Sequence, residues 1–432
     1  MKFKFGALGR DFWLFRFGQI VSIIGDSCGS IAFAWWILDA TGSAAKMASV
    51  MAPAMFFRIF LLPLFGPLGD KFPRKWIIII GDSWRGILTI VITAMAFFKY
   101  FNLPIVITIY ILLAVGSALF GAAAGSIVPQ LVPKEKLQKA MQQEQAIMAG
   151  GSIIGGLAGG FLVTLFGTSG AFLIDGLSFF AAAIASSLII ANTKAAIQTE
   201  TGAARRNALV TWYEDLKEGF RVVVKIPVEL WLAIVAALLN FVVSPIGIAL
   251  PILVKEVRNL PPWFLGALES SVSFGTIIGA LLVGWMCRKL FTDYVVVFGI
   301  VIVGLGVAVL PWIPNPALPV SMMFFIGIGA MLANIPLNTQ MALAMPDEYR
   351  ARSGAITGFI CQLANPLGMA FAGAMITGVG LNITMLLCGT ILIILSPLMF
   401  LIPKFSEFFR LPPEKAANFY KDNYPNAFIK GK

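Results

Sequence analysis

Residues 66–75 have the sequence Gly-Pro-Leu-Gly-Asp-Lys-Phe-Pro-Arg-Lys, a short basic segment between two long apolar runs. The flanking runs cover residues 44–68 and 76–98. Each run is long enough to cross a lipid bilayer, because a spanning helix needs about 20 mostly apolar residues. A basic turn between two such runs indicates a loop at the membrane surface. The segment therefore predicts two membrane-spanning helices joined by a short loop.

The composition of the whole chain supports a membrane protein. Its 432 residues are 59% hydrophobic and 12% charged, and the mean hydropathy is +0.88. Ordinary soluble proteins are about 45–50% apolar and about 25% charged, so a water-soluble enzyme is excluded. The net charge of +11 is spread over short clusters between apolar runs, which argues against nucleic-acid binding. The lipid bilayer is the expected partner of this surface.

The apolar runs predict both the number of spans and their orientation. With the N-terminus placed in the cytoplasm, 26 of the 32 lysines and arginines fall on the cytoplasmic side. We therefore expect a multi-pass protein of the cell membrane with both termini in the cytoplasm. The twelve predicted spans are 12–38, 44–68, 76–98, 104–128, 140–166, 169–190, 228–254, 263–287, 294–312, 318–343, 354–377 and 381–401.

The longest polar stretch divides these spans into six plus six. We predict an N-terminal six-helix bundle at 1–192, a cytoplasmic linker at 193–227, a C-terminal six-helix bundle at 228–403 and a cytoplasmic tail at 404–432. The two halves also match at a constant offset of 213 residues, which pairs Gly155 with Gly368. Duplicated halves around a cavity are typical of alternating-access transporters.

The second part of the linker has the pattern of an amphipathic helix. Trp212, Leu216, Phe220 and Val223 or Val224 fall on one helical face, with basic residues on the other side. This pattern predicts a helix along the membrane surface. A tether without activity of its own is an equally good interpretation.

The loop between the second and third spans carries a family resemblance. Gly66, Asp70, Arg74 and Lys75 resemble the G-x-x-x-D-x-x-x-R-K loop of the major facilitator superfamily, at the position where that family has it. The resemblance implies an all-α membrane protein whose twelve transmembrane helices form two pseudo-symmetric six-helix bundles. It also implies that the loop latches a gate. Physically, Asp70 can cap a helix end or pair with a base, and the two bases can anchor at lipid headgroups.

Further segments are similar to one branch of that superfamily. Residues 37–43, 81–86 and 334–338 resemble the branch of macrolide-efflux and enterobactin-exporter proteins. A glycine series in the fifth span resembles the g-x-x-x-G-P-x-x-G-G motif of proton-driven exporters, with glycine in place of the proline. Small residues at this spacing also serve helix packing. The series comprises Gly151, Gly155, Gly156, Gly159 and Gly160.

Asp26 is the strongest candidate for coupling transport to protons. It lies about 14 residues into the first span, about 21 Å along a helix. Gln19, Ser22, Asp26 and Ser30 recur at helical spacing and form one polar stripe. The first span lines the cavity in the resembling family, which implies a proton carrier or cation site at Asp26. The alternative is a static ion pair with Arg58, which could instead meet an anionic substrate group.

Other ionisable residues within the spans predict structural pairs. Asp82 and Arg85 stand three residues apart on the third span, close enough to pair near the cytoplasmic gate. Glu144, at a similar depth, is a candidate member of the same cluster. Asp175 lies near the outer end of its span, where a solvated or capping role is expected.

The second half of the chain offers amides and a hydroxyl in place of charges. Such groups can hydrogen-bond a substrate without the cost of a buried charge, although they also hold helices together. The candidate cavity residues are Asn240, Ser244, Asn334, Asn338, Gln362 and Asn365.

These patterns together predict a secondary active transporter. The resemblance implies export of small amphiphilic, drug-like molecules by proton antiport with alternating access, and we expect a monomer. The chain has no histidine, and its four cysteines form no C-x-x-C pair, so no metal site or cofactor is expected. Open alternatives are a lysophospholipid or lipid flippase and a carrier of siderophore-type anions. A channel or a membrane-embedded enzyme is more remote, since no nucleophile–base pair stands out.

Overall fold

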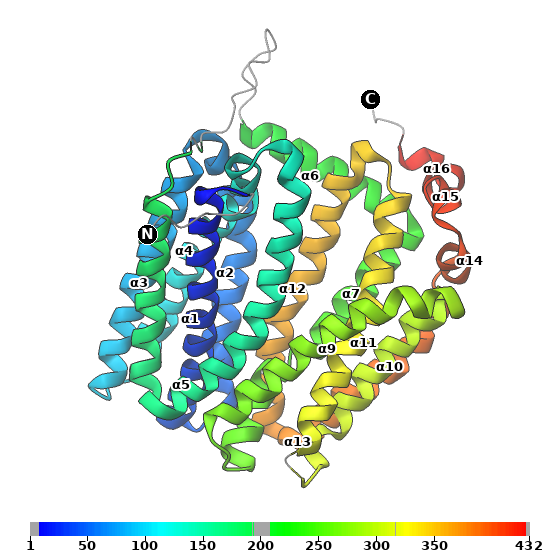
Figure 1. Ribbon diagram of the computed structural model, residues 1–432. Coiled ribbons are helices and arrows are strands. Elements are labelled where there is room, and N and C mark those ends of the chain that lie inside the picture. Colours follow the sequence, from blue (N-terminus) through cyan, green and yellow to red (C-terminus); the bar gives the residue numbers. More distant parts are fainter. Residues whose placement is uncertain (1–7, 192, 194–207, 316, 429–432) are drawn as a thin grey trace. The chain divides into compact units, whose positions relative to one another are not determined.

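The computed structural model describes residues 8–191, 193, 208–315 and 317–428, and this part of the chain is mostly helical (Figure 1). The long helices alternate with short turns, as the apolar runs predict. The helices are α1 (Arg10–Thr41), α2 (Ala44–Lys71), α3 (Arg74–Phe97), α4 (Leu103–Leu131), α5 (Leu137–Ser187), α6 (Ala208–Lys225), α7 (Pro227–Val243), α8 (Ile246–Ile252), α9 (Pro262–Lys289), α10 (Thr292–Val309), α11 (Ala317–Ala344), α12 (Asp347–Val379), α13 (Leu381–Leu398), α14 (Phe405–Arg410), α15 (Pro413–Ala416) and α16 (Phe419–Asn423).

Within the described residues, eleven helical segments are long and apolar enough to cross a membrane. The difference from the twelve predicted spans arises in α5, whose 51 residues contain both the fifth and the sixth predicted span. Gly167 interrupts α5 with φ 67° and ψ −176°. Glycine has no Cβ and adopts this backbone conformation without strain. The chain therefore changes direction where the sequence predicts the boundary between two spans.

The chain forms two compact units. The first comprises Met1–Thr201 with Ile248–Ser270, and the second comprises Gly202–Gly247 with Ser271–Lys432. Residues 248–270 group with the first unit because they pack on α1 and α5: Lys255 forms an ion pair with Asp39 and donates to the carbonyl oxygen of Trp35 at 2.8 Å. The bundle and linker boundaries inferred from the sequence are not those of the compact units and stay predictions.

In the first unit, the glycine series of α5 lies where helix backbones come closest. A Cβ on Gly159 would lie 2.9 Å from the backbone nitrogen of Cys28, and one on Gly160 would lie 2.8 Å from the Cα of Trp263. Only residues without a Cβ allow helices to approach this closely. Three members of the series face α1 and two face α9: Gly151, Gly155 and Gly159 in the first case, Gly156 and Gly160 in the second.

The second unit repeats this packing at the position that the sequence offset predicts. Gly368 of α12 lies against the backbone of Phe241 and the hydroxyl of Ser244 on α7. Gly155, its counterpart in α5, lies against the hydroxyl of Ser27 and the carbonyl of Ile23 on α1. Each unit thus uses an equivalent glycine to seat one long helix on another.

The linker helix packs on α12. Glu218 of α6 forms an ion pair with Arg352, and a Cβ on Gly219 would touch the backbone of the same arginine. Val223 is fully buried, whereas Phe220 is exposed, so the predicted apolar face is only partly turned inward. The side chains of Trp212 and Leu216 lie outside the described part of the chain.

The C-terminal tail also packs on the second unit. Arg410 forms an ion pair with Asp293 at 2.8 Å, and Gln340 donates to the carbonyl oxygen of Phe408 at 2.7 Å. Tyr420 donates its hydroxyl proton to Glu229 of α7. Burial, together with the nearby carboxylate of Glu229, raises the pKa of Tyr420 well above its ordinary value. The phenol therefore stays a proton donor across the neutral range.

Replacing Gly159 by Ala tests the contact between α1 and α5. The added methyl group forces the helices apart, so we expect the free energy of unfolding to fall by about 1–3 kcal/mol, the usual cost of overpacking. Chemical unfolding of the purified protein in detergent measures this change. Gly150→Ala on the same helix is the matched control, because its Cβ would meet no atom within 4 Å. Equal stability of the two variants would contradict the proposed role of the glycine.

Replacing Tyr420 by Phe tests the docking of the tail. The change leaves a buried carboxylate short of one donor, which costs about 1–3 kcal/mol. We expect faster trypsin cleavage within residues 413–428 at neutral pH. The pKa of Tyr420 is raised in the folded protein. The stabilisation that its hydrogen bond gives to the docked tail is therefore complete below the ordinary tyrosine pKa of about 10, and it is lost as the pH rises through the raised pKa. Tyr424→Phe is the control, and cleavage equally fast in both variants would count against the contact.

Candidate functional site

Arg85 is the central cation of the first unit. It lies on α3, is 6% exposed and forms an ion pair with Asp82 one turn earlier, as the spacing in sequence predicts. The rings of Phe120 and Phe179 lie 4.6 and 4.2 Å from its guanidinium carbon. Aromatic faces attract a cation, and the neighbouring carboxylate offsets the cost of burying it.

Asp26 is a second and looser partner of the same arginine. Its Oδ2 lies 3.9 Å from Nη1 of Arg85, and its side chain is 53% exposed, whereas Asp82 is 1% exposed. Arg58 of α2, an exposed residue, lies within electrostatic range of Asp26. The ion-pair partner of Asp26 is thus Arg85 of α3. The alternative drawn from the sequence was a pair with Arg58.

Asp175 is a third carboxylate near this arginine. It is 7% exposed, so the expected solvated or capping role is wrong. The second half of α5 runs along α1 and seats the carboxylate on Gly29, where an added Cβ would lie 2.2 Å from its Oδ2. Asp175 interacts electrostatically with both Asp26 and Arg85. Sequence reasoning missed this placement because it follows from the turn at Gly167.

Glu144 belongs to a different ion pair. Its Oε2 lies 2.9 Å from Nη2 of Arg16 on α1, and this arginine is fully buried. The expectation that Glu144 joins the cluster of Asp82 and Arg85 is therefore wrong. Arg16 also donates to Gln19, and its guanidinium carbon lies 5.2 Å from the ring of Phe12. The helices place Glu144 beside residue 16 because the first half of α5 packs on the opposite face of α1 from its second half.

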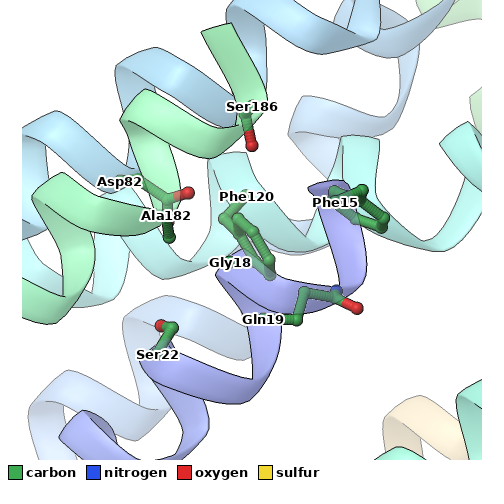
Figure 2. A pocket seen from close by; sticks show the side chains of 8 residues that line it. All are labelled: Phe15, Gly18, Gln19, Ser22, Asp82, Phe120, Ala182 and Ser186. Carbon is green, nitrogen blue, oxygen red and sulfur yellow. The ribbon is translucent and has the colours of Figure 1, made fainter. Parts of the chain in front are cut away.

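The predicted polar stripe of α1 divides between a pocket and the surface. Gln19 and Ser22 are buried and line a small pocket with Asp82, as Figure 2 shows. Ser30 is exposed and donates to the carbonyl oxygen of Ser27 at 2.9 Å. Other residues of the pocket come from α1, α4 and α5: Phe15, Gly18, Phe120, Ala182 and Ser186.

The bases of the predicted gate loop bind backbone carbonyls. Arg74 donates to Ser126 of α4 at 2.6 Å, and Lys75 donates to Ile189, just after α5, at 2.6 Å. Cations at helix C-termini are favourable because the carbonyl dipoles point toward them. These contacts engage both bases, and their anchoring at lipid headgroups stays a prediction. Gly66 and Asp70 lie in α2, and their side chains are outside the described part of the chain.

The candidate polar residues of the second unit contact a neighbouring helix or their own helix. Asn240 donates to the carbonyl oxygen of Cys361 at 3.2 Å and so links α7 to α12. Asn365 donates to Gln362 at 2.9 Å, and Asn334 donates to Ala330 on its own helix. Ser244 donates to the carbonyl oxygen of Phe241 at 3.0 Å, and Asn338 is exposed.

Glu229 is a functional candidate that the sequence patterns do not predict. This residue is buried at the start of α7, where it accepts hydrogen bonds from Tyr420 and, at 3.3 Å, from Thr357. A lone acid at the edge of an apolar span was the available signal. Its main donor lies 191 residues away in the tail, and only the folded chain brings the two together.

The chain is similar to known membrane transporters. A family model described as Major Facilitator Superfamily matches residues 16–369. Macrolide efflux protein A of Streptococcus pyogenes is 24% identical over 397 residues, covering 90% of this chain and 95% of that protein. Multidrug efflux pump Tap of Mycolicibacterium fortuitum is 24% identical over 404 residues, covering 91% and 96%.

A solved structure extends the likeness to the fold. The crystal structure of a bacterial homolog to the human lysosomal transporter Spinster, inward-facing and unoccupied, has a TM-score of 0.74 at 16% identity. The match covers 95% of this chain and all of that one. The predicted family and all-helical fold are thereby confirmed, and the protein is a membrane transporter, not an enzyme. The chain belongs to the Major Facilitator Superfamily.

Proposed function

We propose that this protein exports small amphiphilic molecules by proton antiport through alternating access. The efflux relatives, one named for macrolides and one for multiple drugs, support a substrate of this class. The protein acts as a monomer in the cell membrane, with both termini in the cytoplasm. Exposed amides on α11 and α12 are candidates for polar contacts with the substrate: Asn334, Asn338 and Gln362.

One observation carries the proton-coupled part of the proposal. Arg85 has a close partner in Asp82, and Oδ2 of Asp26 lies 3.9 Å from the same guanidinium in a looser ion pair. Asp26 is also the more exposed of the two acids. A carboxylate within the membrane is costly unless it is paired, protonated or bound to a cation. Asp26 is therefore suited to exchange a proton for a cationic or polar group of a substrate.

The proposed cycle makes binding of the two ligands mutually exclusive. A proton from outside neutralises Asp26, which weakens its hold on the substrate and releases it. After reorientation, Asp26 loses the proton to the cytoplasm and regains affinity for the next molecule. Arg85 stabilises the charged form in each round because it remains near both acids.

Replacing Asp26 by Asn should uncouple transport from the proton gradient. For one-for-one exchange, a gradient of one pH unit sustains about a tenfold substrate ratio. In the variant we expect this ratio to fall toward one, since the amide cannot take up a proton. Proteoliposomes loaded with a radiolabelled macrolide, or with an amphiphilic dye that shifts the melting temperature, provide the measurement.

Asp39→Asn is the matched control, because Asp39 lies on the same helix and pairs with Lys255 at an exposed site. Full gradient-driven transport by the Asp26 variant would refute the coupling mechanism. Arg58→Gln provides a separate arm: loss of transport of an anionic siderophore-type substrate, with coupling intact, would favour the anion carrier. Movement of a fluorescent lysophospholipid between leaflets would favour the flippase.

A further inference from the structure

The pocket in Figure 2 contains a buried carboxylate oxygen without a protein partner. Asp82 directs Oδ1 to Arg85, whereas its Oδ2 accepts no hydrogen bond from a described residue. The side chain is 1% exposed, so bulk solvent does not serve this oxygen. Leaving such an acceptor unpaired is expensive in a medium of low polarity.

Two hydroxyl groups reach the same pocket from other helices. Ser22 of α1 and Ser186 of α5 are buried and line it. Figure 2 shows the hydroxyl of Ser186 and the carboxylate of Asp82 directed into the same space. The other lining residues are Gln19, whose side-chain oxygen accepts a hydrogen bond from Arg16, and apolar residues: Phe15, Gly18, Phe120 and Ala182.

Four buried polar side chains line this small space, those of Asp82, Ser22, Ser186 and Gln19, and they satisfy the requirements of a bound water. Buried polar atoms are nearly always hydrogen-bonded to protein or to ordered water. A buried water typically has two to four polar partners, and the space here suits about one molecule. We propose that this pocket is a water-binding site and that, through this water, Asp82 exchanges protons as a second carboxyl beside Asp26. This role of Asp82 rests on the proposed proton coupling.

Protonation of Asp82 would change the ion pairs of the charged residues around it. Arg85 on its own helix pairs with it, Asp26 on α1 shares that arginine, and Arg58 on α2 acts on Asp26. α5 contributes Asp175, and α4 has no charged residue. A hydronium ion in the pocket passes one proton to Oδ2 of Asp82 and remains as water. Arg85 is then released to pair with Asp26, and the reverse transfer restores the first pairing.

Infrared spectroscopy of the protein in lipid nanodiscs tests this proposal without any substrate. A pH titration should reveal a protonated-carboxyl band that disappears in Asp82→Asn and shifts in Asp82→Glu, which retains the acid. In heavy water, the band should exchange its proton rapidly in the unchanged protein. Ser186→Val fills the pocket and removes a hydroxyl. Exchange should then slow on the order of tenfold or more, because it must wait for local opening of the bundle.

Ser187→Val is the matched control, since this neighbouring serine is exposed and donates to Ile184 outside the pocket. The proposal is overturned if no carboxyl band depends on residue 82, or if exchange is equally fast in the Ser186 and Ser187 variants. Ser22→Val fills the pocket from α1 and must give the same slowing as Ser186→Val. The efflux assay of the Asp26 variant measures transport, whereas the infrared assay measures proton exchange without substrate. Failure of the proposed coupling and failure of the proposed water site therefore give different results.

Discussion

Glycines on one face of α1 and along the first half of α5 let these two helices pack closely, and the buried charges follow from that contact. Lipid provides no hydrophobic force between helices, so close packing of small residues contributes much of their association. The first half of α5 packs through Gly155 and Gly159 on one face of α1. The second half packs on the opposite face, against Gly25 and Gly29. The turn at Gly167 makes both contacts available to one helix.

The polar stripe of α1 occupies the face between these two contacts. At 100° per residue, positions 19, 22, 26 and 30 point about a quarter turn away from the glycines that meet the second half of α5. Asp26 therefore faces α3 and the guanidinium of Arg85 at 3.9 Å. Asp26, Asp82 and Asp175 all interact with Arg85, and Arg58 also acts on Asp26.

The second unit has the same packing with different chemistry. Gly368 seats α12 on α7 as Gly155 seats α5 on α1, but in this unit the buried acid Glu229 accepts hydrogen bonds from Tyr420 and Thr357. Its donors include a residue of the tail, which ties α16 to a spanning helix. The duplicated halves thus share a scaffold, whereas the first unit alone combines a half-exposed acid with a shared arginine among the described residues.

Local chemistry was sufficient to predict the spans, the Asp82–Arg85 pair and helix packing at the glycine series, because each depends on residues close in sequence, whereas most of the loop expected at residues 66–75 is helical. The apolar runs had to form helices, since backbone polar groups cannot stay unpaired in lipid. Tertiary structure alone decided the partners of Asp26, Glu144, Asp175 and Glu229. Their contacts join helices that are distant in sequence, and helix rotation, which packing determines, selects the side chains that meet. One turn at Gly167 moved Asp175 from an expected solvated end into the core.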